Sequence, residues 1–108
     1  MTDATAELLI RARGFLERGW CRNAFARGPL GWPVFPKSKL ANRWCASGAL
    51  LAAGLPDNEY RTEYWTHPAV YRLREAMDWE DISRFNDRQA MVEPVLAAFD
   101  RAIAMGDR

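Results

Sequence analysis

The sequence has no apolar run long enough to cross a membrane. Its longest mainly apolar stretch, residues 46–55, contains Gly48 and Gly54 and falls far short of the ~20 residues that a membrane-spanning helix needs. The first residues include Asp3 and Glu7 and have neither a basic segment nor a continuous apolar one, unlike a secretory signal. We therefore expect a cytoplasmic protein that makes no use of a membrane.

Cysteine and histidine are also scarce, with two cysteines and one histidine among 108 residues. Cytoplasmic thiols are normally reduced, so we predict that Cys21 and Cys45 are free and not bonded to each other. These two cysteines and His67 lack the close spacing of zinc ligands, such as Cys-x-x-Cys. We expect no metal site and no cofactor.

An excess of one charge is missing as well. The sequence has 15 Lys and Arg against 14 Asp and Glu, for a formal net charge of +1, whereas a dedicated nucleic-acid binder usually has a clear basic excess. The first half is nevertheless biased toward basic residues, namely Arg11, Arg13, Arg18, Arg22, Arg27, Lys37, Lys39 and Arg43. We interpret this bias as two solvated surfaces of opposite charge. A weak nucleic-acid site in the first half is the alternative.

The composition is that of a globular domain. Hydrophobic residues make up 49% of the chain and include five Trp and five Phe, which fill a small core with few side chains. The length fits a single helical domain over residues 1–108. We predict a mainly α fold, a compact bundle of about four to five helices around a central apolar helix. A short β-hairpin is expected within residues 20–36.

Apolar residues at helical spacing locate the helices. The central helix is predicted at residues 38–53, because this stretch is apolar nearly all round, starts at Ser38 as N-cap and stops at Gly54. Residues 79–86 are expected to form a connection, and Pro94 to kink the helix that follows it. The remaining helices are predicted at residues 6–18, 57–64, 67–77 and 87–105.

Glycine and proline are concentrated between residues 20 and 36, where they exclude regular helix. Residues 23–27 and 32–35 are predicted to pair across the Gly28–Pro29 turn. The hairpin is expected to lean on the helices through its aromatic side chains Trp20, Phe25, Trp32 and Phe35. The predicted core consists of Trp44, Cys45, Leu51, Leu73, Val95, Leu96 and Phe99.

Helix starts leave backbone N–H groups without partners, and short polar side chains beside several predicted starts can accept from them. The candidate caps are Asp3 or Thr5, Asp57, Thr66 or His67, and Asn86 or Asp87. We predict that Asn86 or Asp87 caps the last helix and that Arg43 pairs with Asp87.

Three segments resemble a known family. They are Glu-Arg-Gly-Trp-Cys at 17–21, Arg-Trp-Cys-Ala-Ser-Gly-Ala-Leu at 43–50, and Phe-Asn-Asp at 85–87 before a helix with Val-Leu-Ala-Ala-Phe at 95–99. Together they are similar to small proteins of unknown function from bacteria and their phages. That family has Gly-Trp after the first helix, a Trp-Cys-x-x-Gly-Ala helix, and Trp-Asn-Asp before the last helix. Phe85 stands where the family usually has Trp. The resemblance covers nearly the whole chain and implies a domain type, not an activity.

The order Cys45, His67, Asn86 is that of papain-like cysteine peptidases and amidases, and Asp87 follows directly. A reactive thiolate needs a helix N-terminus or a cationic neighbour to hold its charge. The predicted helix places Cys45 about two turns inside, among apolar residues, where a thiol is inert. A small hydrolase or transferase using Cys45 is therefore the alternative hypothesis.

Our first hypothesis is a non-enzymatic domain that binds a protein partner or a second copy of itself. Trp32, in the Gly- and Pro-rich loop, is the leading candidate contact, because aromatic side chains anchor many interfaces. Arg43, Asn86 and Asp87 are the other candidate binding residues. The sequence leaves the identity of the partner open.

Overall fold

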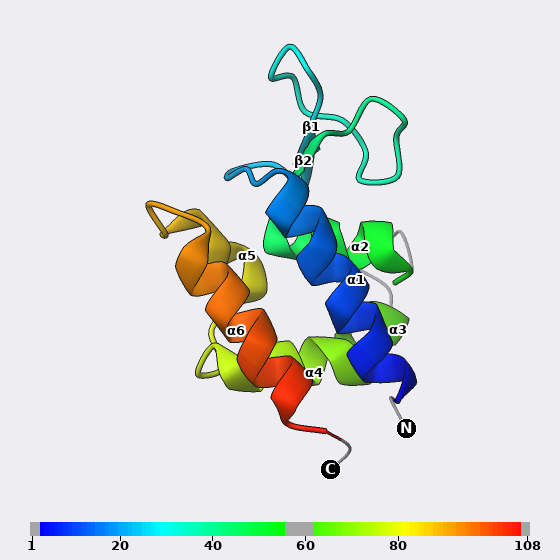
Figure 1. Ribbon diagram of the computed structural model, residues 1–108, viewed down its shortest axis with the longest axis vertical. Coiled ribbons are helices and arrows are strands. Elements are labelled where there is room, and N and C mark those ends of the chain that lie inside the picture. The colour runs from blue at the N-terminus through cyan, green and yellow to red at the C-terminus, as the bar shows by residue number, and fades with distance from the viewer. Residues whose placement is uncertain (1–2, 56–61, 107–108) are drawn as a thin grey trace.

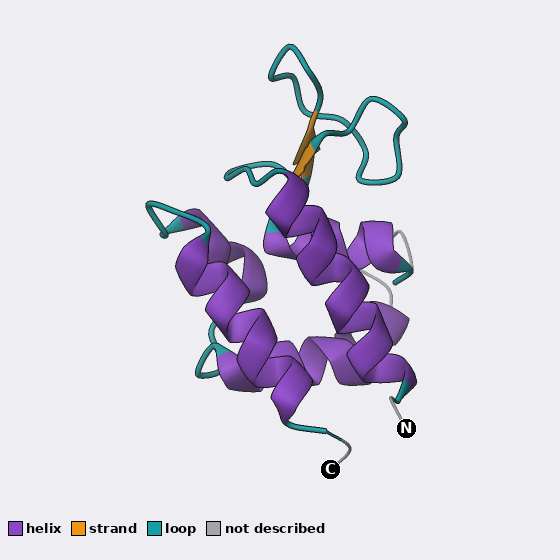
Figure 2. Ribbon diagram, in the orientation of Figure 1, coloured by secondary structure: helices purple, strands orange, loops and turns teal. Residues whose placement is uncertain are grey.

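The computed structural model describes residues 3–55 and 62–106, and there the chain is mainly helical, as predicted (Figures 1 and 2). The elements in chain order are α1 Ala4–Arg18, β1 Ala26–Arg27, β2 Arg43–Trp44, α2 Ala46–Ala53, α3 Thr62–Thr66, α4 Pro68–Ala76, α5 Ile82–Asp87 and α6 Glu93–Ala104. The helices form the body of the molecule. The two strands and the loops between them project from one end of it (Figure 2).

Helices α1 and α2 share the centre of the fold. α1 begins where the Asp3 carboxylate accepts a hydrogen bond from Ala6 N at 2.7 Å, which confirms the predicted cap. It packs against α2, α4 and α6. α2 is buried along nearly its whole length, as predicted for a central apolar helix, and it packs against α1 and α5.

The predicted helix at residues 38–53 is wrong in its first half. Residues 38–45 are not helical, and α2 begins only at Ala46. β2 instead pairs with β1 in antiparallel register, with Trp44 opposite Ala26. Pairing with a segment far earlier in the chain takes up the backbone groups that a longer helix would have paired internally.

The predicted hairpin forms in part. Arg27 and Pro33 make an antiparallel bridge, and Val34 N donates a hydrogen bond to Ala26 O at 3.0 Å. The segments on either side of the Gly-Pro turn therefore meet, as predicted. Strand β1 nevertheless pairs over both of its residues with β2, whereas the hairpin contributes a single bridge. The sequence did not indicate the pairing of β1 with β2.

The start of α4 was read correctly from the sequence. His67 Nδ1 accepts a hydrogen bond from Ala69 N at 3.0 Å, and Pro68 lies in the first turn, where its missing N–H is harmless. The prediction of a helix at 57–64 with an Asp57 cap falls mostly on residues outside those that the structure describes.

The predicted connection at residues 79–86 is wrong, because α5 occupies most of it. Asp81 caps α5 by accepting a hydrogen bond from Arg84 N at 3.1 Å. Ile82 and Phe85 turn into the core. Two apolar residues three apart were too few to indicate a helix of six residues.

The last helix starts later than predicted. α6 begins at Glu93 with Pro94 in its first turn, so Pro94 starts the helix instead of kinking it. The N-cap is Val92, which makes no side-chain capping bond. Asn86 and Asp87 end α5, and the prediction that one of them caps the last helix is wrong.

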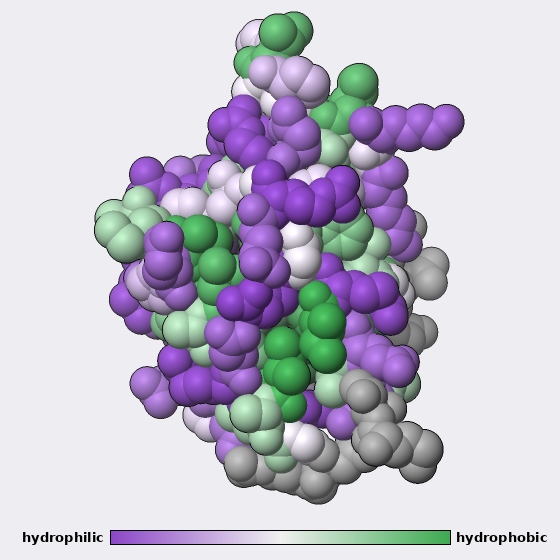
Figure 3. Space-filling model, in the orientation of Figure 1, coloured by the Kyte–Doolittle hydropathy of each residue, from purple (hydrophilic) through white to green (hydrophobic). Residues whose placement is uncertain are grey.

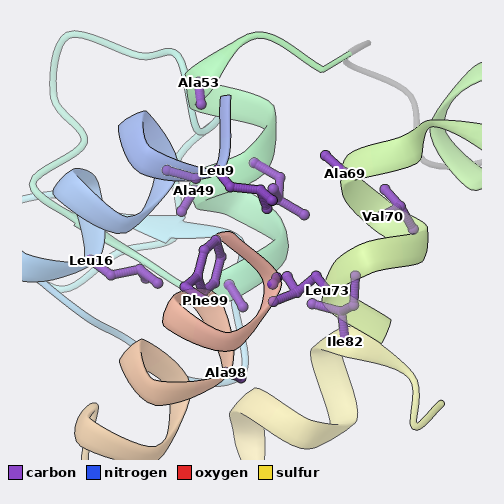
Figure 4. Packing of buried hydrophobic residues seen from close by; sticks show 14 of the residues in the cluster. Leu9, Leu16, Ala49, Ala53, Ala69, Val70, Leu73, Ile82, Ala98 and Phe99 are labelled. Carbon is purple, nitrogen blue, oxygen red and sulfur yellow. The ribbon is translucent and has the colours of Figure 1, made fainter. Parts of the chain in front are cut away.

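Side chains from α1, α2, α4, α5 and α6 meet in one hydrophobic core (Figure 4). Leu9, Leu16 and Phe99 point into its centre in that view. Six of the seven predicted core residues are buried, namely Trp44, Cys45, Leu51, Leu73, Val95 and Phe99. Leu96 is only half-buried and packs at the edge of the core.

Candidate functional site

Cys45 lies between β2 and α2, not two turns inside a helix, because α2 starts one residue later. Its sulfur accepts a hydrogen bond from Gly48 N at 3.3 Å, so Cys45 is the N-cap of α2. A helix N-terminus lowers the pKa of a thiol, but burial has the larger effect here and raises the pKa of Cys45 to about 12. The thiol therefore stays protonated at neutral pH and is a poor nucleophile.

His67 lies away from Cys45. It stands at the start of α4, whereas Cys45 lies at the junction of β2 and α2, well separated from it in Figure 1. Its Nδ1 accepts the capping bond from Ala69 N, and partial burial lowers the pKa of His67. The structure does not bring together the cysteine and histidine that a papain-like mechanism needs.

Asn86 is fully buried and joins three parts of the chain. Its Oδ1 accepts hydrogen bonds from Trp20 Nε1 at 2.8 Å and from Ala46 N at 3.0 Å. Its Nδ2 donates to Cys21 O at 3.1 Å and to Asp87 Oδ1 at 3.0 Å. Because both side-chain hydrogens and the oxygen are engaged, we assign Asn86 a structural role, with one bond serving the first turn of α2.

Asp87 is held within the same network. Its Oδ1 also accepts a hydrogen bond from Asn23 N at 2.9 Å, which holds Asn23 at a left-handed φ of 65°. The predicted pair between Arg43 and Asp87 is wrong, because the Arg43 guanidinium donates to Gly28 O at 3.4 Å instead. Arg43 therefore supports the loop that follows β1.

A hollow of about 410 Å³ lies beside this network, lined by Asn23, Ala24, Phe25, Cys45, Ser83 and Asp87. The structure thus brings Cys45 and Asp87 to one place, with Asn86 directly behind them. The Ser83 hydroxyl there shares a hydrogen bond with Ser47 Oγ at 3.1 Å. No histidine lines this hollow. Its one carboxylate, Asp87, is the only candidate base in the lining, and its Oδ1 already accepts hydrogen bonds from Asn23 N and Asn86 Nδ2.

The strongest candidate for a functional site is the pair of loops that leads from β1 to β2. Four large apolar side chains project from them into solvent: Leu30 is 86% exposed, Trp32 72%, Phe35 85% and Leu40 63%. We call these four residues the loop surface. Apolar groups appear in green at the tips of the loops, at the top of Figure 3.

Sequence reasoning found only part of this surface. Trp32 was expected to lean on the helices and was also named as a candidate contact for a partner. It is exposed, so the first expectation is wrong and the second stays a prediction. Phe35 was expected to pack on the helices, and Leu40 to lie on the apolar face of a helix; both are exposed instead. No pattern in this Gly- and Pro-rich stretch of the sequence distinguishes its exposed apolar residues from its buried ones.

Hydrogen bonds hold the first loop in shape. Gly28 N donates to Trp32 O at 3.0 Å, and Gly31 N donates to Gly28 O at 2.9 Å. Gly31 has a φ of 86°, which a side chain would disfavour. The Arg27 guanidinium donates to Gly31 O at 2.9 Å. The tip that presents Leu30 and Trp32 is therefore held by both backbone and side-chain bonds.

The second loop is tied to the body of the protein by the buried Trp44. Its indole N–H donates to Pro36 O at 3.0 Å, and its ring packs against Phe15 of α1 with centroids 4.8 Å apart. Pro36 lies within a turn that is closed by a hydrogen bond from Ser38 N to Phe35 O at 2.9 Å. Phe35 is thus exposed on a loop whose base is anchored in the core.

Three hollows lie among these loops, and the smallest and the largest of them flank the exposed apolar side chains. One of about 220 Å³ has an entirely apolar lining that includes Leu30, Trp32 and Leu40. The other, of about 590 Å³, lies between Phe35 and Phe25. This larger hollow shares Asn23, Ala24 and Phe25 with the hollow of about 410 Å³ beside Cys45. The loop surface therefore combines projecting apolar side chains with recesses between them.

The stretch of sequence that contains the loop surface carries charge of one sign. From residue 18 to residue 56 the sequence contains no Asp or Glu, and its six cationic side chains are Arg18, Arg22, Arg27, Lys37, Lys39 and Arg43. Two of these, Arg27 and Arg43, brace the first loop. The apolar loop surface is therefore set in a basic stretch.

Within residues 3–55 and 62–106, no three His, Cys, Asp or Glu side chains lie close enough together to hold a metal ion. In the same residues, none of the helices combines the length and the apolar character needed to cross a bilayer. Both cysteines are free, as predicted.

Comparison with known protein families gives a match over nearly the whole chain. Residues 1–105 match DUF6197, a family of unknown function. No curated protein and no solved structure matches the chain.

Proposed function

The chain belongs to the family DUF6197, whose function is unknown, and we propose that it is a protein-binding domain whose loop surface takes an acidic partner with apolar side chains. The observation that carries this proposal is the exposure of Leu30, Trp32, Phe35 and Leu40 on loops held in place by hydrogen bonds.

Exposed apolar area of this kind is typical of interfaces. Scattered apolar residues are common on protein surfaces, whereas a cluster of large ones marks a contact site. Of the nine large exposed hydrophobic residues in the described chain, four fall within the eleven residues 30–40. Trp and Phe anchors that are already positioned lose little conformational entropy on binding.

The shape of the site favours a protein over a nucleic acid as the partner. The recesses beside Trp32 and Phe35 are concave and largely apolar, which suits the insertion of partner side chains. Nucleic-acid bases mainly stack on aromatic rings, yet Leu30 and Leu40 are half of this surface.

The charge of the loops determines the kind of partner. Six cations and no acid between residues 18 and 56 attract an acidic surface and repel a basic one. Apolar side chains on the partner then fill the recesses. The cysteine-dependent alternative has less support, because burial raises the pKa of Cys45 to about 12 and His67 lies elsewhere.

The test uses a short synthetic peptide in which Glu alternates with Leu and Trp, and a matched peptide with Lys in place of Glu. Amide chemical shifts of the isotope-labelled full chain are followed during each titration. We expect the acidic peptide alone to shift residues 28–42, with binding that weakens as salt rises. Replacing both Trp32→Ala and Phe35→Ala should reduce affinity about tenfold or more.

The matched control is the double variant Ile10→Ala and Met91→Ala, which removes two exposed apolar side chains elsewhere and should leave binding unchanged. Shifts outside residues 28–42 would overturn the proposal. So would tighter binding of a single-stranded oligonucleotide or of anionic lipid vesicles to the same loops, since either would identify a different class of ligand.

A further inference from the structure

A second group of exposed aromatic residues lies at the opposite end of the molecule from the loop surface. Tyr71 on α4 and Trp79 just after α4 are 51% and 52% exposed, and their rings meet edge to face with centroids 6.2 Å apart. We call Tyr71, Glu75, Asp78 and Trp79 the α4 surface. Figure 1 shows α4 at the end of the long axis opposite the loops.

The turn after α4 holds Trp79 in an unusual conformation. Asp78 and Trp79 have φ values of 55° and 66°, in the left-handed region that bulky residues rarely adopt. Trp79 N donates to Arg74 O at 2.7 Å, and Arg74 Nη2 donates to Trp79 O at 3.2 Å. These bonds keep a large ring half in solvent, and strained residues of this kind cluster at binding sites.

A hollow of about 380 Å³ opens beside the two rings. Its lining includes Pro68, Tyr71, Arg72, Glu75 and Trp79. Two aromatic rings beside a carboxylate can bind a partner segment in which an apolar side chain lies next to a cationic one.

The charge of the α4 surface is the reverse of that of the loops. Residues 75–81 contain four acids, Glu75, Asp78, Glu80 and Asp81, and no Lys or Arg. Two cations lie close to these acids. Arg72 is buried and pairs with Asp3 at 3.1 Å, and Arg74 has its Cζ 5.9 Å from the centroid of the Trp79 ring. Glu80 pairs with Arg88 at 2.8 Å, so Glu75 and Asp78 carry the acidic character of the α4 surface.

We propose that the loop surface of one copy docks on the α4 surface of a second copy, with the apolar side chains of the loops entering the hollow beside Tyr71 and Trp79. This inference rests on the proposed function and names its partner. Each surface has what the other lacks: the loops supply cations and projecting apolar side chains, and the α4 surface supplies acids and an aromatic recess.

The arrangement of the two surfaces sets the form of the assembly. They lie at opposite ends of a molecule that measures 41 × 26 × 26 Å. One contact therefore leaves a free loop surface on one copy and a free α4 surface on the other. Such a head-to-tail contact adds further copies until a ring closes or a filament grows.

The experiment follows the sedimentation of the full chain between roughly 10 µM and 1 mM, where contacts of modest size associate. We expect the weight-average sedimentation coefficient to rise with concentration at low salt and to fall to the monomer value at high salt. Two variants each disable one surface: Trp32→Ala with Phe35→Ala, and Glu75→Gln with Asp78→Asn. Asn suits the left-handed φ of Asp78, so the second pair keeps the turn.

Each variant alone should stay monomeric, because each lacks one half of the contact. Mixed together they should form a one-to-one dimer and nothing larger, since one intact loop surface remains for one intact α4 surface. Ile10→Ala and Glu93→Gln serve as controls that assemble like the natural chain. Circular dichroism confirms that every variant is folded.

Three results would overturn the inference. A chain that is monomeric at every concentration while its loops still bind the acidic peptide would leave the proposed function intact and remove the second copy as partner. Self-association of the Glu75→Gln, Asp78→Asn variant into dimers would indicate a loop-to-loop contact. Failure of the two folded variants to associate when mixed would exclude head-to-tail pairing.

Discussion

The side-chain oxygen of Asn86 accepts a hydrogen bond from the backbone N–H of Ala46, forty residues earlier in the chain, at 3.0 Å. This bond satisfies the first N–H of α2 from the end of α5. The same amide group bonds Trp20 and Cys21, which follow α1. One buried side chain therefore joins the ends of three helices.

Asn86→Ala should destabilise the protein more than the loss of a local cap does. It leaves Ala46 N, Trp20 Nε1 and Cys21 O without partners, and each buried unsatisfied group costs about 1–3 kcal/mol. We expect a loss of about 3 kcal/mol or more in the free energy of unfolding from urea denaturation.

Asn86→Ser is the informative companion variant. A serine restores a local N-cap well, but it is too short to span three elements, so it should recover little of the loss. Substantial recovery by Ser, or a loss below about 1 kcal/mol for Ala, would contradict the joining role of Asn86.

The buried thiol of Cys45 should make stability fall at alkaline pH. Burial raises its pKa from 9.0 to about 12, so the folded state keeps a proton that the unfolded state releases above pH 9. This stabilising contribution is complete below pH 9 and is lost progressively between pH 9 and 12. The decline is about 0.7 kcal/mol per pH unit at pH 9 and approaches about 1.4 kcal/mol per pH unit in the middle of this window.

The measurement compares urea unfolding of the natural chain and the Cys45→Ala variant at pH 8 and above. The variant should lose less stability with rising pH, whatever its stability at pH 8. Equal slopes for the two proteins, or rapid alkylation of Cys45 in the folded state at neutral pH, would show that the thiol is not held protonated by burial.

Two glycines in helices should respond oppositely to substitution by alanine. A Cβ at Gly48 would lie 1.8 Å from Phe25 O and 2.7 Å from Phe25 C, so the backbone of one segment would have to move. At Gly14, in the middle of α1, a Cβ would meet nothing within 4 Å.

We therefore expect Gly14→Ala to stabilise the protein by roughly 0.5–1 kcal/mol through helix propensity. Gly48→Ala should destabilise it by about 2 kcal/mol or more, as overpacking against rigid backbone does. Thermal unfolding of the two variants distinguishes these signs. Similar melting temperatures for both would argue against the close approach of α2 to Phe25.

Leu73 and Leu96 test how the burial of a leucine determines the stability that is lost when alanine replaces it. Leu73 is fully buried, and Leu73→Ala should reduce the free energy of unfolding by about 2–5 kcal/mol. Leu96 was also predicted to lie in the core, but it is only half-buried. Leu96→Ala should therefore lose about half as much. Equal losses in urea denaturation would place Leu96 in the core after all.

Features that depend on neighbouring residues were predictable from the sequence. The Asp3 cap and the His67–Pro68 start of α4 use partners within three residues, so the residue types at fixed spacing suffice to identify them. Of the seven residues that apolar spacing predicted for the core, six are buried. The candidate site was predictable only in its Trp32, because Gly and Pro mark a loop without showing which of its side chains face solvent.

By itself the sequence determined that the chain is mainly helical, where α1 and α4 begin, and which family it resembles. Only the tertiary structure decided that residues 43–44 pair with residues 26–27 and that Asn86 serves α2 instead of the last helix. The physical reason is distance along the chain. A cap or a helical turn is selected by contacts a few residues apart, whereas Asn86 bonds partners 40 to 66 residues away. Such bonds exist only once the helices have packed.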